Sequence, residues 1–130
     1  MIVVDASAVL DVVLRTAGAS AIEERLFADG ERLHAPHLLD LEVMQAIRRH
    51  RLRDAITDAR ASHAVELLSV LPLTRHEHRS LTNRIWALHH NLTAYDAAYI
   101  ALAEALDAPL VTRDAKLASA PGHRATVELV

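Results

Sequence analysis

Cysteine is absent from this sequence of 130 residues, and glycine and aromatic residues are scarce. Without cysteine the chain cannot form a disulfide framework, a thiolate zinc site or a catalytic thiol. Its three glycines, at positions 18, 30 and 122, form no phosphate-binding loop, and no serine nucleophile elbow is present. Aromatic residues make up 3% of the chain, too few for a platform on which successive bases of a single strand stack.

Long apolar runs are also missing. Asp, Arg or His interrupts each run well before the ~18 residues that a membrane span requires. Residues 1–5 lack the charged start and the small-residue cleavage site of a signal peptide. We therefore expect a cytoplasmic protein with no membrane segment.

The charge balance restricts how the chain can meet nucleic acid. Fourteen basic residues against seventeen acidic ones give a formal net charge of −3, which excludes a polycation that coats nucleic acid by charge alone. Any such contact must come from a local patch. Apolar residues make up 52% of the chain, enough for a sizeable core, and the length fits a single domain over residues 1–130.

Short apolar runs alternate with segments of helical periodicity along the chain. Strands are predicted at residues 2–4, 33–35, 70–73, 109–112 and 126–130, and helices at 8–14, 19–28, 37–53, 54–68, 81–90, 93–106 and 115–118. This alternation predicts an α/β fold, a three-layer sandwich in which helices flank a mainly parallel central sheet.

Helix starts and helix faces can also be predicted. Ser7 is expected to cap the helix at 8–14, and Asp54 the helix at 54–68. In the helix at 37–53 the apolar positions at helical spacing predict the buried face. They are Leu38, Leu41, Met44 (or Val43) and Ile47.

Four acidic residues fall where a parallel α/β sheet binds ligands, at the carboxyl ends of its strands. Asp5 ends the first strand, and Asp114 lies just past the strand at 109–112. Asp96 lies in the first turn of the helix at 93–106, and Glu42 in the first turns after Pro36. Burying several like charges together is costly, and a divalent cation removes that cost. Oxygen-only ligation favours Mg²⁺ or Mn²⁺.

Each acidic residue also has a structural interpretation when it is considered alone. Asp5 and Asp114 can cap the helices that follow them, and Asp96 can complete a capping box with Thr93. Glu42 can be a solvated residue on an exposed helix face. The order of the four residues along the chain is more informative than any one of them.

That order carries a resemblance. The segments are Ile2-Val3-Val4-Asp5-Ala6-Ser7-Ala8, Pro36 with Leu39-Asp40-Leu41-Glu42-Val43, Thr93-Ala94-Tyr95-Asp96-Ala97-Ala98-Tyr99, and Val111-Thr112-Arg113-Asp114. Together they resemble the PIN-domain family and, more narrowly, the VapC-type toxins of bacterial toxin–antitoxin pairs. No single motif is decisive, but the four in this order span almost the whole chain.

The resemblance implies a Mg²⁺-dependent ribonuclease, with Mn²⁺ as a possible substitute, that hydrolyses RNA phosphodiesters. Asp5 and Asp96 would be the direct metal ligands, and Glu42 and Asp114 would complete the acidic pocket through a second ion or through water. The hydroxyls of Ser7 and Thr112 would hold water or orient a carboxylate. These six residues are the full set that the resemblance assigns to the pocket.

The resemblance also implies partners, namely a small antitoxin encoded beside the toxin, and a second copy of the chain in a homodimer. Such antitoxins wrap the toxin with an amphipathic segment. Four apolar residues near the acidic pocket could line the groove for that segment, although a place in the core is the favoured interpretation. They are Leu10, Val13, Leu38 and Leu39.

The densest positive cluster begins six residues after Glu42. It consists of Arg48, Arg49, Arg51 and Arg53, together with His50. It can position RNA phosphates, or it can be a solvated helix end whose cations suit the helix dipole. Arg113 has the same two interpretations, RNA contact or structural ion pair, whereas Tyr95 and Tyr99 are expected to be packing residues.

Two other functional classes compete with a nuclease. A PIN-like module could bind RNA or a partner without cutting, although intact acids at all four positions disfavour it. A phosphoacceptor signalling domain would have acids around Mg²⁺, but it needs a lysine at the end of a late strand. The only lysine here is Lys116, two residues after Asp114.

Overall fold

A five-stranded, fully parallel sheet forms the centre of the computed structural model, which describes residues 1–130. The strands lie in the order β3-β2-β1-β4-β5. Their bounds are β1 (Ile2–Val4), β2 (Leu33–Pro36), β3 (Leu73–His76), β4 (Leu110–Thr112) and β5 (Val127–Leu129). All five strands therefore end at one edge of the sheet, which we call the carboxyl edge.

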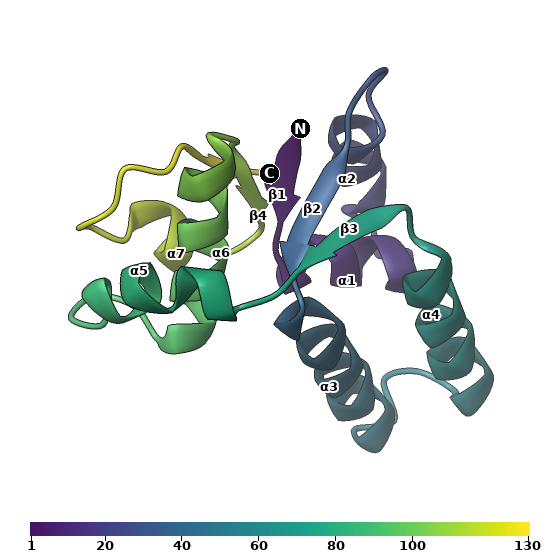
Figure 1. The fold of residues 1–130 in the computed structure, drawn as a ribbon. Coiled ribbons are helices and arrows are strands. Elements are labelled where there is room, and N and C mark those ends of the chain that lie inside the picture. Colours follow the sequence, from purple (N-terminus) through teal and green to yellow (C-terminus); the bar gives the residue numbers. More distant parts are fainter.

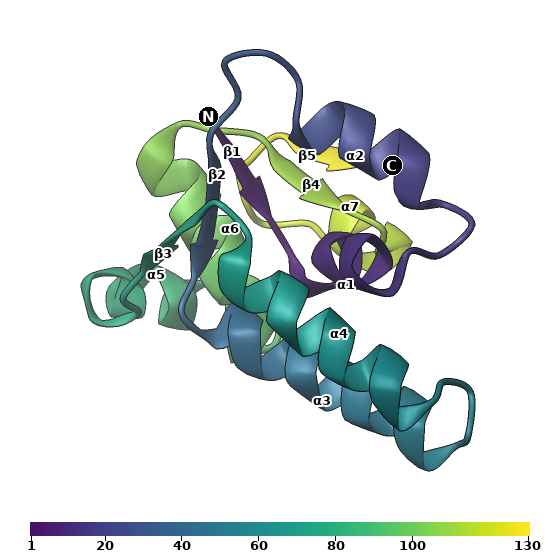
Figure 2. The ribbon, with the colours of Figure 1, turned by 90° about the vertical axis from the view of Figure 1, so that its right-hand side faces the viewer.

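Helices cover both faces of this sheet (Figure 1). On one side lie α1 (Ala6–Leu14), α2 (Ala19–Leu26), α3 (Leu38–Leu52) and α4 (Asp58–Val70). On the other lie α5 (Thr82–Ala87), preceded by a 3₁₀ turn at Arg79–Leu81, then α6 (Ala94–Leu106) and α7 (Ala115–Ser119). Figure 2 shows α3 and α4 side by side below the sheet. The predicted three-layer α/β sandwich is confirmed.

The core lies between the two central strands and the helices that cover them. Val3, Val4 and Val111 are fully buried, as is Leu110. Seven consecutive residues of α6, 97–103, are buried, and four of them are alanine. Alanine has no side chain beyond Cβ, so this helix can lie close to the sheet and to α5 at once.

The favoured core interpretation of the four apolar residues near the acidic pocket also holds. Val13 and Leu39 are buried, while Leu10 and Leu38 are half-buried and pack against the core. None of the helices combines the length and the hydropathy needed to cross a lipid bilayer.

Two helix starts differ from their predictions. Asp5, not Ser7, caps α1, because its carboxylate accepts the hydrogen bond from the amide of Ala8. Thr57, not Asp54, caps α4, and Asp54 instead adopts a left-handed backbone with φ 55° in the connection before it. In both cases a neighbouring residue with the same capping ability stands at the right distance from the first free amides.

The third strand is also displaced. It was predicted at residues 70–73, but α4 continues to Val70 and β3 runs over Leu73–His76. Pro72 explains the shift, since proline cannot donate a hydrogen bond to the neighbouring strand and is tolerated only before the paired residues begin. The helix predicted at 81–90 is shorter, since α5 ends at Ala87.

The buried face of α3 is rotated from the predicted one. Its buried residues are Leu39, Val43, Ala46 and Ile47. Leu41 is 69% exposed and Met44 38% exposed, so the alternative choice of Val43 was correct and the choice of Leu41 and Met44 was wrong. Two large apolar side chains are therefore left on the surface of α3.

An almost fully buried carboxylate fastens α6 to its neighbours. The side chain of Glu104 is 2% exposed. Arg84 of α5 donates from Nε at 2.7 Å and from a terminal nitrogen at 3.0 Å, and the backbone amide of Arg124 donates at 2.9 Å. A paired guanidinium and an amide together satisfy this carboxylate, and they hold the pKa of Glu104 below its ordinary value.

We expect Glu104→Gln to lower the free energy of unfolding by about 1–3 kcal/mol at neutral pH, because Arg84 loses a charged hydrogen-bond partner. Urea denaturation followed by circular dichroism measures the change. The pKa of Glu104 is lowered on folding, so its contribution is present above its ordinary pKa and disappears as the pH falls through the lowered value. The difference between wild type and variant should therefore shrink in acid. Glu77→Gln, the same substitution at an exposed glutamate, is the control and should change stability by no more than about 0.5 kcal/mol.

Candidate metal-binding active site

The four predicted acidic residues come from four places at the carboxyl edge. Asp5 follows β1 directly, Asp114 is the second residue after β4, and Glu42 and Asp96 lie in the first turns of α3 and α6. Their charges interact. Asp96 is destabilised as an anion by Asp114 and Asp5, and Glu42 by Asp96 and Asp5. The fold thus gathers residues that lie up to 109 positions apart into one region of negative charge.

Asp5 is the most buried of the four, with 5% of its surface exposed. Its carboxylate accepts hydrogen bonds from the Ser7 hydroxyl at 2.6 Å, from the Ala8 amide at 3.1 Å and from the Thr112 hydroxyl. Burial raises the pKa of Asp5, and these three donors offset part of that rise. Asp5 is therefore both the cap of α1 and a member of the acidic region.

Ser7 and Thr112 connect this carboxylate to the end of β4. The Ser7 hydroxyl accepts from the amide of Arg113 at 2.9 Å, and the Thr112 hydroxyl accepts from the amide of Asp114 at 2.9 Å. Each hydroxyl thus donates to Asp5 and accepts from the backbone that leads to Asp114. The two predicted supporting residues fix how the end of β1 and the end of β4 face each other.

Glu42 is held by a tyrosine from α6. The hydroxyl of Tyr99 donates to Oε1 of Glu42 at 2.7 Å. Burial raises the pKa of Glu42, the hydrogen bond from Tyr99 lowers it, and the charges of Asp96 and Asp5 raise it further. Tyr99 was predicted to be a packing residue, and it is 1% exposed, but it also positions Glu42. The signal for this second role was its place three residues after Asp96, on the same side of the helix.

Asp96 differs from Asp5 and Asp114 because its carboxylate accepts no hydrogen bond from the backbone. Its amide donates to the Thr93 hydroxyl at 3.1 Å, so Thr93 is the residue that caps α6. Burial raises the pKa of Asp96, followed by the charges of Asp114 and Asp5. The start of α6 therefore does not depend on the Asp96 carboxylate for its cap.

Asp114 caps the short helix α7. One of its oxygens accepts from the amides of Lys116 at 2.9 Å and Leu117 at 3.4 Å. The prediction that Asp114 can cap the helix that follows it is thus confirmed. Capping with one oxygen leaves the second oxygen of the carboxylate without such a contact, so the two roles are compatible.

The chemistry of these donors fits a hard divalent cation, because all four are carboxylates and three have a pKa raised by burial and mutual repulsion. Their arrangement does not close around an ion. No group of three or more His, Asp or Glu side chains is close enough to hold a metal ion together. Asp5, Glu42 and Asp114 are each turned toward a hydrogen-bond donor of their own.

The predicted cluster of arginines divides into residues with different roles. Arg51 forms salt bridges with Asp54, at 2.8 Å, and with Asp58, so it joins the end of α3 to the start of α4. Arg53 donates to the carbonyl oxygen of Arg49 and thereby stabilises the helix end. Arg48 and Arg49 are exposed and form no salt bridge. Of the cluster, Arg49 is the one that lines a pocket together with Glu42.

Arg113 has the structural role that was its alternative interpretation. Its Nε lies 3.0 Å from Asp11, and a terminal nitrogen donates to the carbonyl oxygen of Val130 at 3.0 Å. The same guanidinium lies against Gly18, where an added Cβ would come within 2.9 Å of it. The guanidinium of Arg113 thus joins α1 and the C-terminal residue to the end of β4.

A profile of the PIN domain matches residues 2–122, which includes all four acidic positions. The chain belongs to the PIN-domain family. Ribonuclease VapC1 from Mycobacterium tuberculosis is 47% identical over 129 residues, covering 98% of this chain and 96% of the relative.

Solved structures support the fold of this PIN domain. VapBC2 from Rickettsia felis, bound to a DNA fragment from their promoter, has a chain with a TM-score of 0.70 and 14% identity, covering 99% of this chain and 98% of that chain. A toxin–antitoxin complex from Klebsiella pneumoniae has one with a TM-score of 0.64 and 18% identity, covering 92% and 91%. At these identities the likeness shows the fold.

We expect Asp96→Asn to stabilise the PIN domain in EDTA by roughly 0.5–1 kcal/mol, because it removes one of several repelling charges and no backbone hydrogen bond. Thermal denaturation across a pH series measures this. Since the pKa of Asp96 is raised on folding, the repulsion develops as the pH rises through that raised value, and the gain should vanish in acid. An Asp96→Asn protein that is less stable than wild type at neutral pH would contradict the assigned repulsion.

Proposed function

We propose that this PIN domain is a Mg²⁺-dependent endoribonuclease that acts as the toxin of a VapBC-type toxin–antitoxin pair. The observation that carries the proposal is the convergence of Asp5, Glu42, Asp96 and Asp114 at the carboxyl edge, in a chain 47% identical to Ribonuclease VapC1. Asp5 and Asp96 are the proposed direct ligands. Glu42 and Asp114 are proposed to act through a second ion or through water.

The residues of the chain have distinct proposed roles in phosphodiester hydrolysis. When bound, a divalent cation supplies a lowered pKa for the attacking water and neutralises charge on the phosphate. Ser7 and Thr112 keep the Asp5 carboxylate in one orientation, and Tyr99 does the same for Glu42. The raised pKa of Glu42 suits a group that takes a proton from water and later releases it.

Partners follow from the same assignment. We propose that a small antitoxin inhibits the protein, which is supported by the likeness to the Klebsiella pneumoniae toxin–antitoxin complex. A homodimer, which would join two acidic regions along one RNA-binding face, is a further proposal. A cytoplasmic location, where RNA and the antitoxin are both encountered, belongs to the same proposal.

A non-cleaving PIN module is the second candidate, and the absence of any three clustered donors is the observation in its favour. The phosphoacceptor alternative is weaker. Lys116 lies in α7, past the end of β4, and its backbone amide donates a hydrogen bond to the Asp114 carboxylate. That position does not match a lysine at the end of a strand.

The decisive experiment measures cleavage of RNA oligonucleotides by the purified protein with Mg²⁺, with EDTA and as the Asp96→Asn variant. We expect the variant to lose at least about 100-fold in rate, because it removes a proposed metal ligand and leaves the helix cap intact. Asp96→Asn is preferable to Asp5→Ala, since Asp5 also caps α1.

Glu66→Gln is the matched control, because this acid is 79% exposed and lies on α4. It should cleave like wild type. Full activity in Asp96→Asn, or cleavage that persists in EDTA, would remove the acidic region from the mechanism. Calorimetric titration with Mg²⁺ then separates the candidates, since a non-cleaving module has no need of a metal site.

Tyr99→Phe tests the positioning of Glu42. Loss of the hydroxyl removes the hydrogen bond that lowers the pKa of Glu42, so that pKa should rise. We expect a fall in kcat of about 10-fold and a shift of the acid limb of the pH–rate profile to higher pH. The profile separates positioning from general damage to the fold, because a lower rate with an unmoved acid limb would assign Tyr99 to packing alone.

A further inference from the structure

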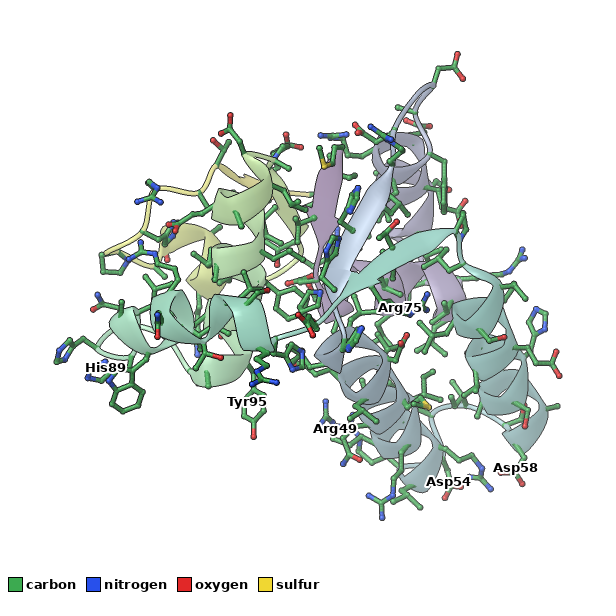
Figure 3. All side chains as sticks on the ribbon, viewed as in Figure 1. Arg49, Asp54, Asp58, Arg75, His89 and Tyr95 are labelled. Carbon is green, nitrogen blue, oxygen red and sulfur yellow. The ribbon has the colours of Figure 1, made fainter.

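A pocket of about 300 Å³ opens directly beside Glu42. Its lining residues, which define what we call the Tyr95 pocket, are Leu41, Glu42, Gln45, Arg49 and Tyr95. Four come from α3, and Tyr95 comes from the first turn of α6, next to Asp96. Figure 3 shows Arg49 on α3 and Tyr95 on the neighbouring element at the same lower edge of the molecule. The Tyr95 pocket is therefore continuous with the acidic region through Glu42.

The spacing of its residues gives the pocket an ordered wall. Leu41, Gln45 and Arg49 follow one another at intervals of four, so they form a stripe along α3. Along this stripe an apolar group, an amide and a guanidinium succeed one another, with the Glu42 carboxylate beside the apolar end. Tyr95, from α6, completes the lining of the pocket.

These side chains are not used to hold the fold together. Tyr95 is 66% exposed and Leu41 69% exposed, so the prediction that Tyr95 packs in the interior was wrong. Arg49 is exposed and forms no salt bridge, in contrast to Arg51 and Arg113. A solvent-exposed ring, an unpaired guanidinium and a free amide beside a catalytic region form a typical set of contacts for a nucleotide.

We propose that the Tyr95 pocket binds one unpaired nucleotide of the RNA substrate, immediately next to the phosphate that is cut. The base stacks on Tyr95 and contacts Leu41, Gln45 hydrogen-bonds the edge of the base, and Arg49 binds a neighbouring phosphate. This inference rests on the proposed ribonuclease function and adds the position at which the enzyme selects its substrate.

The dimensions and charge favour a nucleotide over a segment of a protein partner. A volume of about 300 Å³ lies at the lower end of the usual range for small-molecule pockets, which suits a single base. Arg49 supplies positive charge for an incoming phosphate beside the acidic region. A single ring also agrees with the low aromatic content, because it stacks one base and not a series.

The test is a scan in which each nucleotide of an RNA oligonucleotide is replaced in turn by an abasic residue. Binding is measured by fluorescence anisotropy in the Asp96→Asn background, where hydrolysis is suppressed. We expect one position at which loss of the base weakens binding about 10- to 100-fold. In the same background Tyr95→Ala should remove that penalty, and Tyr95→Phe should keep it.

Two further variants separate the phosphate contact from the base contact. Arg49→Ala should weaken binding of all oligonucleotides and reduce the salt dependence by about one phosphate contact. Gln45→Ala should change which base is preferred at the same single position. Arg32→Ala is the control, since Arg32 is an exposed, unpaired arginine before β2, at the opposite edge of the sheet.

The proposal is overturned if no position shows the penalty, or if the penalty is the same in Tyr95→Ala. It is also overturned if Tyr95→Ala and Arg49→Ala leave RNA binding unchanged but loosen a complex with the antitoxin, because the pocket then belongs to a protein partner. Cleavage by wild type with Mg²⁺ keeps the two proposals apart. Position-specific binding without cleavage retains the pocket and rejects the nuclease, and cleavage without position-specific binding does the reverse.

Discussion

Everything at the carboxyl edge depends on keeping the Asp5 carboxylate buried among other negative charges. A buried anion of this kind is stable only when donors satisfy it, and here two hydroxyls and an amide do so. The same hydroxyls accept from the backbone after β4 and so fix Asp114 relative to β1. One hydrogen-bonded carboxylate thus determines how the two central strands end and where the acidic region lies.

This arrangement sets local stability against proposed activity. The charges of Asp5, Asp96 and Asp114 repel one another, and the fold compensates elsewhere, through an alanine-rich helix pressed against the sheet and through the buried Glu104. Glu104 lies at the far end of α6 from Asp96. The helix is therefore held by the Arg84–Glu104 salt bridge at one end and carries a carboxylate repelled by its neighbours at the other. Such a division is common in active sites, where the residues that do the chemistry are not those that stabilise the fold.

Sequence patterns predicted the sandwich and the four acidic positions, because strand ends and helix starts leave short, local signals. They failed where neighbouring residues compete for one role. Asp5 and Ser7 can both cap α1, and the phase of α3 depends on whether Met44 or Val43 faces the core, which only packing decides. The Tyr99 contact with Glu42 joins residues 57 positions apart. Arg51 forms salt bridges and Arg49 does not, because only Arg51 has acidic side chains within reach in the folded structure. No local pattern contains that information.

The wide spacing of the acidic region along the chain has a consequence for synthesis. Asp5 leaves the ribosome early, but Thr112 and Asp114, which complete its surroundings, are made more than a hundred residues later. Strand β4 must then add to the free edge of β1, a strand that is distant from it in sequence. A nascent chain therefore lacks the assembled region until translation has passed β4, and a ribonuclease built in this order would not cut RNA while most of it is still being made.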